Sequence, residues 1–336
     1  MIKKIIVKEE NIMRKTVKKI VSTVALLALI LVSGCGKAAE KADDVTVRVG
    51  SLKGPTSIGI VRMIHEKENN TKYSFTMETQ ADLLLASVIS GDLDIALIPA
   101  NVASVLYNKT KGGISVIDIN TLGVLYMVSG DSSISSMKDL EGRTVFTTGA
   151  GSTPEYALRY LLSENGLTDS VTVEFKSEAT EVAALLANDP SAVGMLPQPF
   201  VTAALAQNNA LSVVLDMTKE WKALDNGSQL VTGVTIVRND FLKEHPAAVK
   251  AFIADHKSDA EFVNANVETA SEYVAEAGII EKAPVAAKAI PNCNIVCISG
   301  TEMKDMLSGY LQVLYDQNPA SVGGSLPADD FYHIAE

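Results

Sequence analysis

The sequence is poor in cysteine. Only Cys35, Cys293 and Cys297 occur in its 336 residues. So few cysteines exclude the disulfide framework that holds many small secreted domains together. Metal ligation at Cys293 and Cys297 would need further ligands, and no histidine lies near them in the chain. We therefore predict no metal site and interpret both residues as small buried hydrophobic groups, with a strained local disulfide between them as the alternative.

Basic residues are also in short supply. The chain has 29 lysines and arginines against 40 acidic residues, which gives a formal net charge of −11 at pH 7. The segment before Cys35 holds 7 of the basic and 2 of the acidic residues, so the chain from Cys35 onward carries 22 against 38. A surface this acidic repels phosphate backbones and anionic lipid, and nucleic acid is therefore not expected as a partner.

Aromatic residues and histidines are equally sparse. Aromatic residues make up 5% of the chain, which does not support an aromatic cage. Four aromatic side chains could still stack on a ligand ring: Tyr126, Tyr156, Phe200 and Trp221. For Phe200, packing in the core is the default interpretation. The histidines have neither a neighbouring nucleophile nor metal-ligand spacing, so we predict surface positions for His65, His245, His256 and His333. The sequence therefore predicts no catalytic residues and no cofactor.

What the sequence does contain begins with an export signal, predicted over residues 1–34. A basic start precedes the apolar run Ile20–Val32, whose 13 residues are fewer than the roughly 20 that a membrane-spanning helix needs. The tetrapeptide Val-Ser-Gly-Cys ending at Cys35 resembles the bacterial lipobox, so we expect cleavage before Cys35 and a diacylglycerol on its thiol. Two acyl chains give stable membrane anchoring. Met1 and Met13 are both suitable start residues.

The exported part contains an internal repeat. Residues 94–106 align with residues 192–204 at an offset of 98, so that Pro99 coincides with Pro197. Upstream, residues 47–57 align with residues 144–154 at an offset of 97. Each copy predicts strand, loop, helix, strand, helix, strand, proline and helix, which indicates a duplicated βαβαβ unit.

Strands that alternate with helices predict an α/β protein of two lobes, each with a mostly parallel sheet flanked by helices. We expect crossings between the lobes near residues 125–130 and 230–234. The predicted parts are a flexible tether (residues 35–44), the first part of lobe 1 (45–128), lobe 2 (129–233) and a return segment of lobe 1 (234–336).

Ligands of open α/β sheets bind beyond the carboxyl ends of the strands, where loops lead into helices. In a two-lobed protein this edge faces the cleft, and the loops there are rich in hydroxyls, amides and free main-chain N–H groups, which favour an anionic or strongly polar ligand. Capping of the helix ends is the alternative role for each hydroxyl. The candidate ligand-binding residues are Lys53, Thr56, Ser57, Gln80, Pro99, Asn101, Gly151, Ser152, Thr153, Tyr156 and Gln198.

Several segments resemble one family. They are the lipobox at Cys35 and residues 47–57, 87–96, 136–145 and 237–246, which include the phrases Gly-Asp-Leu-Asp-Ile-Ala and Lys-Asp-Leu-Glu-Gly. The chain is similar in these segments to the substrate-binding proteins of ABC importers in the SsuA/THI5-like group, which bind nitrate, sulfonates, taurine or thiamine-pyrimidine precursors. The resemblance implies a type II periplasmic-binding fold, with a transmembrane permease and a cytoplasmic ATPase as partners.

The sequence therefore predicts a monomeric, lipid-anchored receptor on the outer face of the cytoplasmic membrane that closes on a small solute. Two alternatives remain. One is an enzyme of pyrimidine-precursor synthesis on the same fold, although the chain lacks the cysteine run of the yeast-type synthases. The other is an anchored ligand sensor without transport. Because no arginine occurs in the candidate loops, the sequence does not select a sulfonate over the other ligands.

Overall fold

The computed structural model describes residues 45–66 and 71–334. The chain divides into two units, Met1–Ala42 and Asp43–Glu336, and all described residues belong to the second. The predicted export signal, the lipidation residue Cys35 and the predicted tether therefore lie outside the described residues. Among the helices that are described, none combines the length and apolar character needed to cross a membrane.

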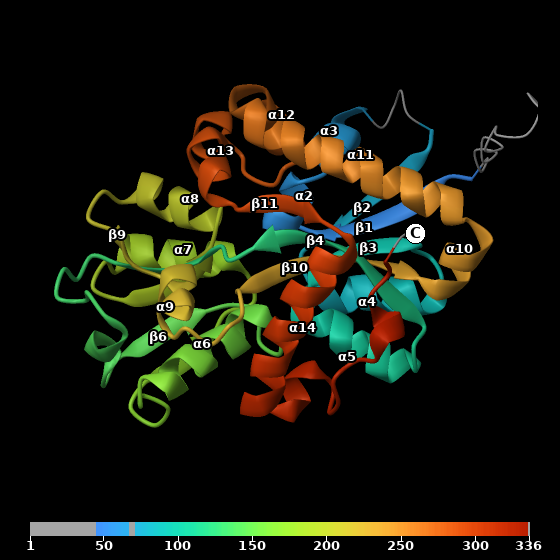
Figure 1. Cartoon of the computed structure of the whole chain (residues 1–336). Coiled ribbons are helices and arrows are strands. Elements are labelled where there is room, and N and C mark those ends of the chain that lie inside the picture. The colour runs from blue at the N-terminus through green and yellow to red at the C-terminus, as the bar shows by residue number, and fades with distance from the viewer. Residues whose placement is uncertain (1–44, 67–70, 335–336) are drawn as a thin grey trace, which may run out of the picture. The chain divides into compact units, whose positions relative to one another are not determined.

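The second unit contains a six-stranded sheet with the spatial order β11-β4-β10-β3-β1-β2. Its strands are β1 (Val47–Leu52), β2 (Tyr73–Glu78), β3 (Ile95–Pro99), β4 (Ile114–Leu122), β10 (Val231–Arg238) and β11 (Ile295–Ile298). The helices between the first four strands are α2 (Pro55–Ile58), α3 (Val61–His65), α4 (Ala81–Ser90) and α5 (Ala100–Thr110). This first sheet is formed by the two ends of the described chain (Figure 1).

The second sheet has five strands in the order β7-β6-β8-β5-β9, all from the middle of the chain. Its strands are β5 (Leu125–Ser129), β6 (Thr144–Thr147), β7 (Thr172–Phe175), β8 (Val193–Pro197) and β9 (Ser212–Asp216). The helices that accompany it are the 3₁₀ helix η2 (Met137–Leu140) and α6 (Thr153–Glu164), α7 (Ala179–Asn188), α8 (Phe200–Gln207) and α9 (Met217–Ala223).

The internal repeat is visible in the strand order. In each sheet the first strand of the module lies between the second and the third, as β2-β1-β3 and as β7-β6-β8. These pairs are parallel. The sheets are nevertheless mixed rather than mostly parallel. In the first sheet β10 pairs antiparallel with β3 and β4, and β4 pairs antiparallel with β11. In the second sheet β5 pairs antiparallel with β8 and β9. Among the described strands, parallel pairing is thus confined to the duplicated modules; an isolated parallel bridge joins Val116 and Tyr332.

The chain passes between the sheets at different residues from those expected. The first passage lies between β4 and β5, at Gly123 and Val124, and the return lies between α9 and β10. The predicted boundary at residues 128 and 129 falls inside β5, whose register places Leu125 opposite Pro197 in the second sheet. The boundary at residues 233 and 234 likewise falls inside β10, where Gly233 already pairs with Pro99 of the first sheet.

The returning segment supplies the remaining helices. They are α10 (Asn239–Glu244), α11 (Pro246–Ala265), α12 (Val267–Glu276), α13 (Ala283–Ala289) and α14 (Gly300–Gln317), with the 3₁₀ helices η3 (Ile290–Asn292), η4 (Pro319–Val322) and η5 (Asp329–Phe331). Pro246 occupies the first turn of α11, where its missing N–H removes no helical hydrogen bond.

Alternation of side chains along the strands builds a core on both faces of the first sheet. Ile95 and Leu97 of β3 pack in one cluster with Phe252 of α11, whereas Ala96 and Ile98 pack in another with Leu84 of α4. Figure 1 shows α11 on one side of this sheet and α4 and α5 on the other. Successive side chains of a strand point to opposite faces of the sheet, and because they are apolar on both faces here, helices cover both.

Helix α14 joins the cores of the two sheets. Tyr310 of this helix packs against Trp221 of α9, with ring centroids 5.5 Å apart, and Trp221 in turn packs against Tyr160 of α6 at 4.7 Å. Leu307 and Leu311 belong to the same cluster, which also includes residues of β4 and β10. The return segment therefore contacts both sheets, in addition to completing the first.

Candidate ligand-binding cleft

A cavity of about 560 Å³ lies between the two sheets. It is lined by loops and helix starts that follow the carboxyl ends of strands in both modules, as the strand-end rule predicts. Its volume is within the range of about 300–1,000 Å³ that is usual for small-molecule sites. Residues from the first sheet's side include Lys53, Thr56, Gln80 and Pro99, and residues from the second sheet's side include Gly151, Ser152, Thr153, Lys176, Glu178 and Phe200.

Helix N-termini from both sheets converge on this cavity. The first residues of α4, α6 and α7 line it, and the side chains of the residues that precede these helices, Gln80, Ser152 and Glu178, accept no hydrogen bond from the first main-chain N–H groups of the helix. The first main-chain N–H groups of a helix have no partner within the helix, and the helix dipole is positive at this end. The cavity therefore presents hydrogen-bond donors and a positive potential to a guest.

The loop before α6 owes its shape to two glycines. Gly149 and Gly151 have φ angles of 77° and 73°, which side chains with a Cβ rarely adopt. A Cβ at position 149 would also lie 2.7 Å from the hydroxyl oxygen of Ser152. That hydroxyl donates to the carbonyl oxygen of Gly149 at 2.7 Å, and the N–H of Gly151 donates to the Glu155 carboxylate at 2.7 Å. The Glu155 side chain thus already occupies one donor of the loop.

Charged side chains of both signs line the cavity. Lys53 and Lys176 face it together with Asp82 and Glu178, so the formal side-chain charges cancel. The Lys176 ammonium lies 3.7 Å from a carboxylate oxygen of Glu174 and 5.1 Å from the ring centroid of Phe146. The side chains thus give the cleft no excess of positive charge, and the helix ends are the remaining source of positive potential.

Seven of the eleven candidate binding residues line the cavity: Lys53, Thr56, Gln80, Pro99, Gly151, Ser152 and Thr153. Of these, the Thr56 hydroxyl donates to the carbonyl oxygen of Leu52 at 3.0 Å, which fixes the loop that follows β1. Lys53 is exposed. Whether any of these residues contacts a ligand stays a prediction.

The other four candidates lie elsewhere. The buried Ser57 hydroxyl donates to the Ser51 hydroxyl at 2.7 Å, and Gln198 accepts a hydrogen bond from the Thr202 hydroxyl at 2.9 Å. Tyr156 packs against the main core cluster. Asn101 is fully buried and links two loops. These four side chains therefore form contacts within the protein and do not line the cavity.

Some cavity residues are absent from the predicted set. Lys176 and Ser177 directly follow β7, so applying the strand-end rule to the second strand of the second module would have found them. Thr232 lines the cavity from β10, and only the antiparallel pairing of β10 beside β3 brings it there. Of the aromatic candidates, Phe200 lines the cavity, whereas Trp221 is a buried core residue.

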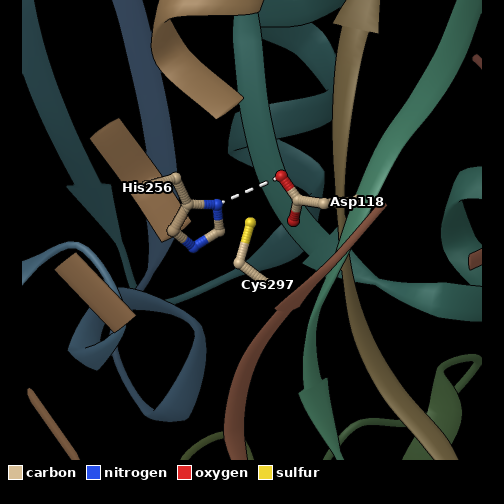
Figure 2. A group of neighbouring side chains, drawn as sticks. All are labelled: Asp118, His256 and Cys297. Carbon is tan, nitrogen blue, oxygen red and sulfur yellow. Dashed lines mark hydrogen bonds and ion pairs between the residues drawn. The ribbon is translucent and has the colours of Figure 1, made fainter. Parts of the chain in front are cut away.

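A second cluster of polar side chains lies away from the cleft. Asp118 of β4, His256 of α11 and Cys297 of β11 place potential ligand atoms within 4.8 Å of one another, as Figure 2 shows. The prediction that His256 is a surface residue is wrong, because its side chain is fully buried and its Nδ1 lies 3.1 Å from Asp118 Oδ2. Neither Cys293 nor Cys297 is in a disulfide.

The comparisons with known proteins agree with this architecture. A family model described as NMT1/THI5 like matches residues 86–270. An ABC transporter structure from Parabacteroides distasonis has a TM-score of 0.72 and 24% identity, and the match covers 87% of this chain and 99% of that one. The periplasmic aliphatic sulphonate-binding protein SsuA from Escherichia coli has a TM-score of 0.66 and 16% identity, with 85% and 95% covered.

A relative from Brucella abortus (strain 2308) is named only as a binding protein. It is 24% identical to this chain over 253 residues. That alignment covers 74% of this chain and 76% of the relative. The structural likeness confirms the predicted two-lobed α/β fold. Because the family model matches more than half of the chain, this protein belongs to the NMT1/THI5-like family.

Proposed function

We propose that this protein is the solute-binding component of an ABC importer. It captures a small anionic or strongly polar molecule in the cleft between its two sheets and delivers it to a membrane permease. Membership of the NMT1/THI5-like family and the likeness to SsuA, which is named for aliphatic sulphonates, support this function.

The convergence of helix N-termini from both sheets on one cavity carries the proposal. The starts of α4 and α6 line the same cavity, one from each module, although Pro154 contributes no N–H group at the start of α6. A negatively charged guest would accept hydrogen bonds from both sides and would be stabilised by both helix dipoles. Such a guest binds the closed arrangement of the lobes more tightly than an open one, and this difference is what drives closure.

The side chains of the cavity narrow the class of ligand. Lys53 and Lys176 complement an anionic group, and Asp82 and Glu178 can accept hydrogen bonds from an amine or hydroxyl elsewhere on the ligand. A cavity of about 560 Å³ is larger than a nitrate ion requires. These features favour an organic anion or zwitterion, such as a sulfonate, or a pyrimidine-type compound with polar substituents.

No histidine or cysteine is among the described residues that line the cavity, so this lining offers no Ser–His or Cys–His pair. We therefore propose binding without catalysis. The lipobox at Cys35 supports a location on the outer face of the cytoplasmic membrane, with the permease and its ATPase as partners of a monomeric receptor.

Thermal-shift screening of the purified protein tests the binding function. The panel contains alkyl sulfonates, taurine, nitrate and pyrimidine compounds, because a ligand that binds only the folded state raises its stability by RT ln(1 + [L]/Kd). At a concentration of 100 Kd the gain is about 2.7 kcal/mol. Absence of any shift across the panel at millimolar concentrations would contradict the proposed ligand class.

Variants of the cavity lysines test the site itself. Lys53→Met and Lys176→Met should each weaken binding of the anionic hit about 10- to 100-fold, because each removes a charge-assisted hydrogen bond of about 1.5–3 kcal/mol. Lys219→Met is the matched control, since Lys219 lies outside the cavity lining and its side chain is 83% exposed. Equal affinities of all three variants by calorimetry would place the ligand elsewhere.

Membrane experiments test the anchor and the partners. Cys35→Ala should move the protein from the membrane fraction to the soluble exported fraction and abolish labelling by a radioactive fatty acid. Pull-down of the wild-type protein from solubilised membranes should recover a permease and an ATPase. Recovery of a signalling kinase alone would favour a sensor, and conversion of a bound pyrimidine compound would favour an enzyme.

A further inference from the structure

Three side chains from distant parts of the sequence meet inside the first sheet's side of the molecule. Asp118, His256 and Cys297 come from β4, α11 and β11, and none of them lines the ligand cavity. The side chains of Asp118 and His256 are fully buried, and Cys297 is partly buried. In Figure 2 the Cys297 sulfur points toward the gap between the His256 ring and the Asp118 carboxylate. Each residue therefore offers a metal-ligating atom to the same small space.

The chemistry of the three groups selects a class of ion. Carboxylate oxygen, imidazole nitrogen and thiolate sulfur are all zinc ligands, and three protein ligands are enough where a water completes the tetrahedron. Magnesium and calcium take oxygen ligands almost exclusively, so this set does not suit them. The mixed N, O and S set therefore indicates a borderline transition-metal ion of the zinc class.

The spacing is compatible with such an ion. Asp118 Oδ2 and His256 Nδ1 are 3.1 Å apart. Two ligands at about 2.0–2.1 Å from a tetrahedral ion are separated by about 3.3–3.4 Å. An ion could thus replace the proton between these two atoms with little movement of β4 or α11. The ligand atoms of the three residues all lie within 4.8 Å of one another, so an adjustment of the Cys297 side chain brings its sulfur to the same ion.

Hydrogen bonds from neighbouring groups hold the Asp118 side chain in place. The other carboxylate oxygen of Asp118 accepts a hydrogen bond from the Thr235 hydroxyl at 2.6 Å, and the Thr235 oxygen accepts one from Asn120 at 3.2 Å. Outer hydrogen bonds of this kind orient metal ligands and tune their affinity. The other imidazole nitrogen, His256 Nε2, is buried and has no hydrogen-bond partner among the described residues.

We propose that Asp118, His256 and Cys297 bind one ion of the zinc class. The ion ties the strand that leads into the second sheet, β4, to the helix α11 and the strand β11 of the returning segment. It is separate from the solute site, so the proposal holds or fails independently of the proposed transport function.

Metal analysis of the purified full-length protein in detergent tests the site. The protein is stripped with a chelator under reducing conditions, exposed to Zn²⁺ and dialysed, and its zinc content is measured by mass spectrometry. We expect one Zn²⁺ per chain in the wild type and at least a tenfold lower content in Cys297→Ser and in Asp118→Asn. Cys293→Ser is the matched control: Cys293 is a buried thiol of the same segment, it donates to the carbonyl oxygen of Ala289, and it should keep the full content.

Cobalt spectroscopy tests the site even if the Cys297 and Asp118 variants fail to fold, because it needs only the wild type and the Cys293→Ser control. Co²⁺ bound through Cys297 should give a thiolate-to-cobalt charge-transfer band in the near ultraviolet, in the wild type and in Cys293→Ser alike. A wild type that retains no Zn²⁺ and shows no such band overturns the proposal. Zinc that persists in folded Cys297→Ser overturns it as well, since the ion would then be bound elsewhere.

Discussion

The side-chain amide of Asn101 donates a hydrogen bond to the main-chain carbonyl oxygen of Gly151 across 3.2 Å. The same amide donates to the carbonyl oxygen of Ser321 at 3.0 Å, and its oxygen accepts from the Thr153 hydroxyl at 3.3 Å. Asn101 is the second residue of helix α5, beside the first sheet, whereas Gly151 and Thr153 belong to the loop and the helix start beside the second. One buried side chain thus fastens a wall of the cleft to the opposite lobe.

Replacing Asn101 by Ala should therefore affect both stability and binding. Loss of a buried hydrogen-bond partner costs about 1–3 kcal/mol of unfolding free energy. Because the 149–153 loop loses its fixed position, the affinity for the ligand found by thermal-shift screening should also fall, by roughly three- to tenfold. Denaturant unfolding and calorimetry measure the two effects.

Asn108→Ala is the control for this prediction. Asn108 lies on the same helix and its amide donates to the carbonyl oxygens of Val322 and Ser325 at 2.9 and 2.7 Å, but it does not touch the glycine loop. It should lower stability and leave affinity unchanged. If Asn101→Ala and Asn108→Ala behaved alike in calorimetry, the link from Asn101 to the cleft would have no role in binding.

Asp94 is the buried centre of an ion-pair network in the first sheet. Its carboxylate accepts hydrogen bonds from the main-chain N–H of Arg48 at 3.0 Å, from the Arg48 Nε at 2.9 Å and from the Arg238 guanidinium at 3.1 Å. Burial alone would raise the pKa of Asp94, but the hydrogen bonds and charges of Arg48 and Arg238 hold it below its ordinary value. The charged form is therefore the stable one in the folded protein.

Asp94→Ala should lower the unfolding free energy by about 1.5–3 kcal/mol, because it removes the hydrogen bonds of Arg48 and Arg238 to a charged acceptor, while both arginines stay partly exposed to water. Asp92→Ala, two residues earlier in the same Gly-Asp-Leu-Asp-Ile-Ala phrase, should change it by less than about 0.5 kcal/mol, since Asp92 is exposed. The stabilisation from Asp94 is present above the unfolded-state pKa and is lost as the pH falls through the lower folded-state pKa. Urea unfolding of both variants checks the contrast, and equal losses would contradict it.

Short-range patterns were enough to predict much of the fold and part of the cavity lining. The strand–loop–helix repeat around Pro99 and Pro197 identified the two modules, and the rule that ligands lie beyond strand ends led to Thr56, Gln80 and Ser152 on the cavity wall. Each of these inferences depends on neighbours within a few residues along the chain. The same local reasoning assigned Ser57 and Gln198 to the cleft, because it could not tell a hydroxyl or amide that faces a guest from one that bonds to the protein.

Long-range pairing was beyond such reasoning. His256 stands between two charged residues, Asp255 and Lys257, which favours a surface position in the sequence. Its partner Asp118 is 138 residues away, and Asp118 and Cys297 approach it only because β4 and β11 pair antiparallel beneath α11. The mixed character of the sheets has the same origin, since the insertion of β10 between β3 and β4 joins segments more than 100 residues apart. Periodicity reveals which face of an element is buried, but not which distant element covers it.

Asp259 makes the stability of the fold depend on pH in the opposite sense to Asp94. Burial raises the pKa of this carboxyl to about 6, although the main-chain N–H of Met63, at 2.9 Å, and the Arg62 guanidinium, at 3.3 Å, favour its charged form. A carboxyl whose folded-state pKa exceeds its unfolded-state value takes up a proton on folding, so its contribution to stability falls as the pH rises from about 4 to about 6 and stays low above that.

Asp259→Asn should remove this dependence while keeping an oxygen that accepts from Met63. We expect the unfolding free energy of the wild type, relative to Asp259→Asn, to fall by about 2–3 kcal/mol between pH 4 and pH 7, because a pKa difference of one unit corresponds to 1.36 kcal/mol. Guanidinium unfolding at several pH values in that window measures the difference directly, and the subtraction cancels the titration of all other groups. A difference that is constant with pH, or that rises with it, would mean that Arg62 and Met63 outweigh burial and that Asp259 is charged in the folded protein throughout the range.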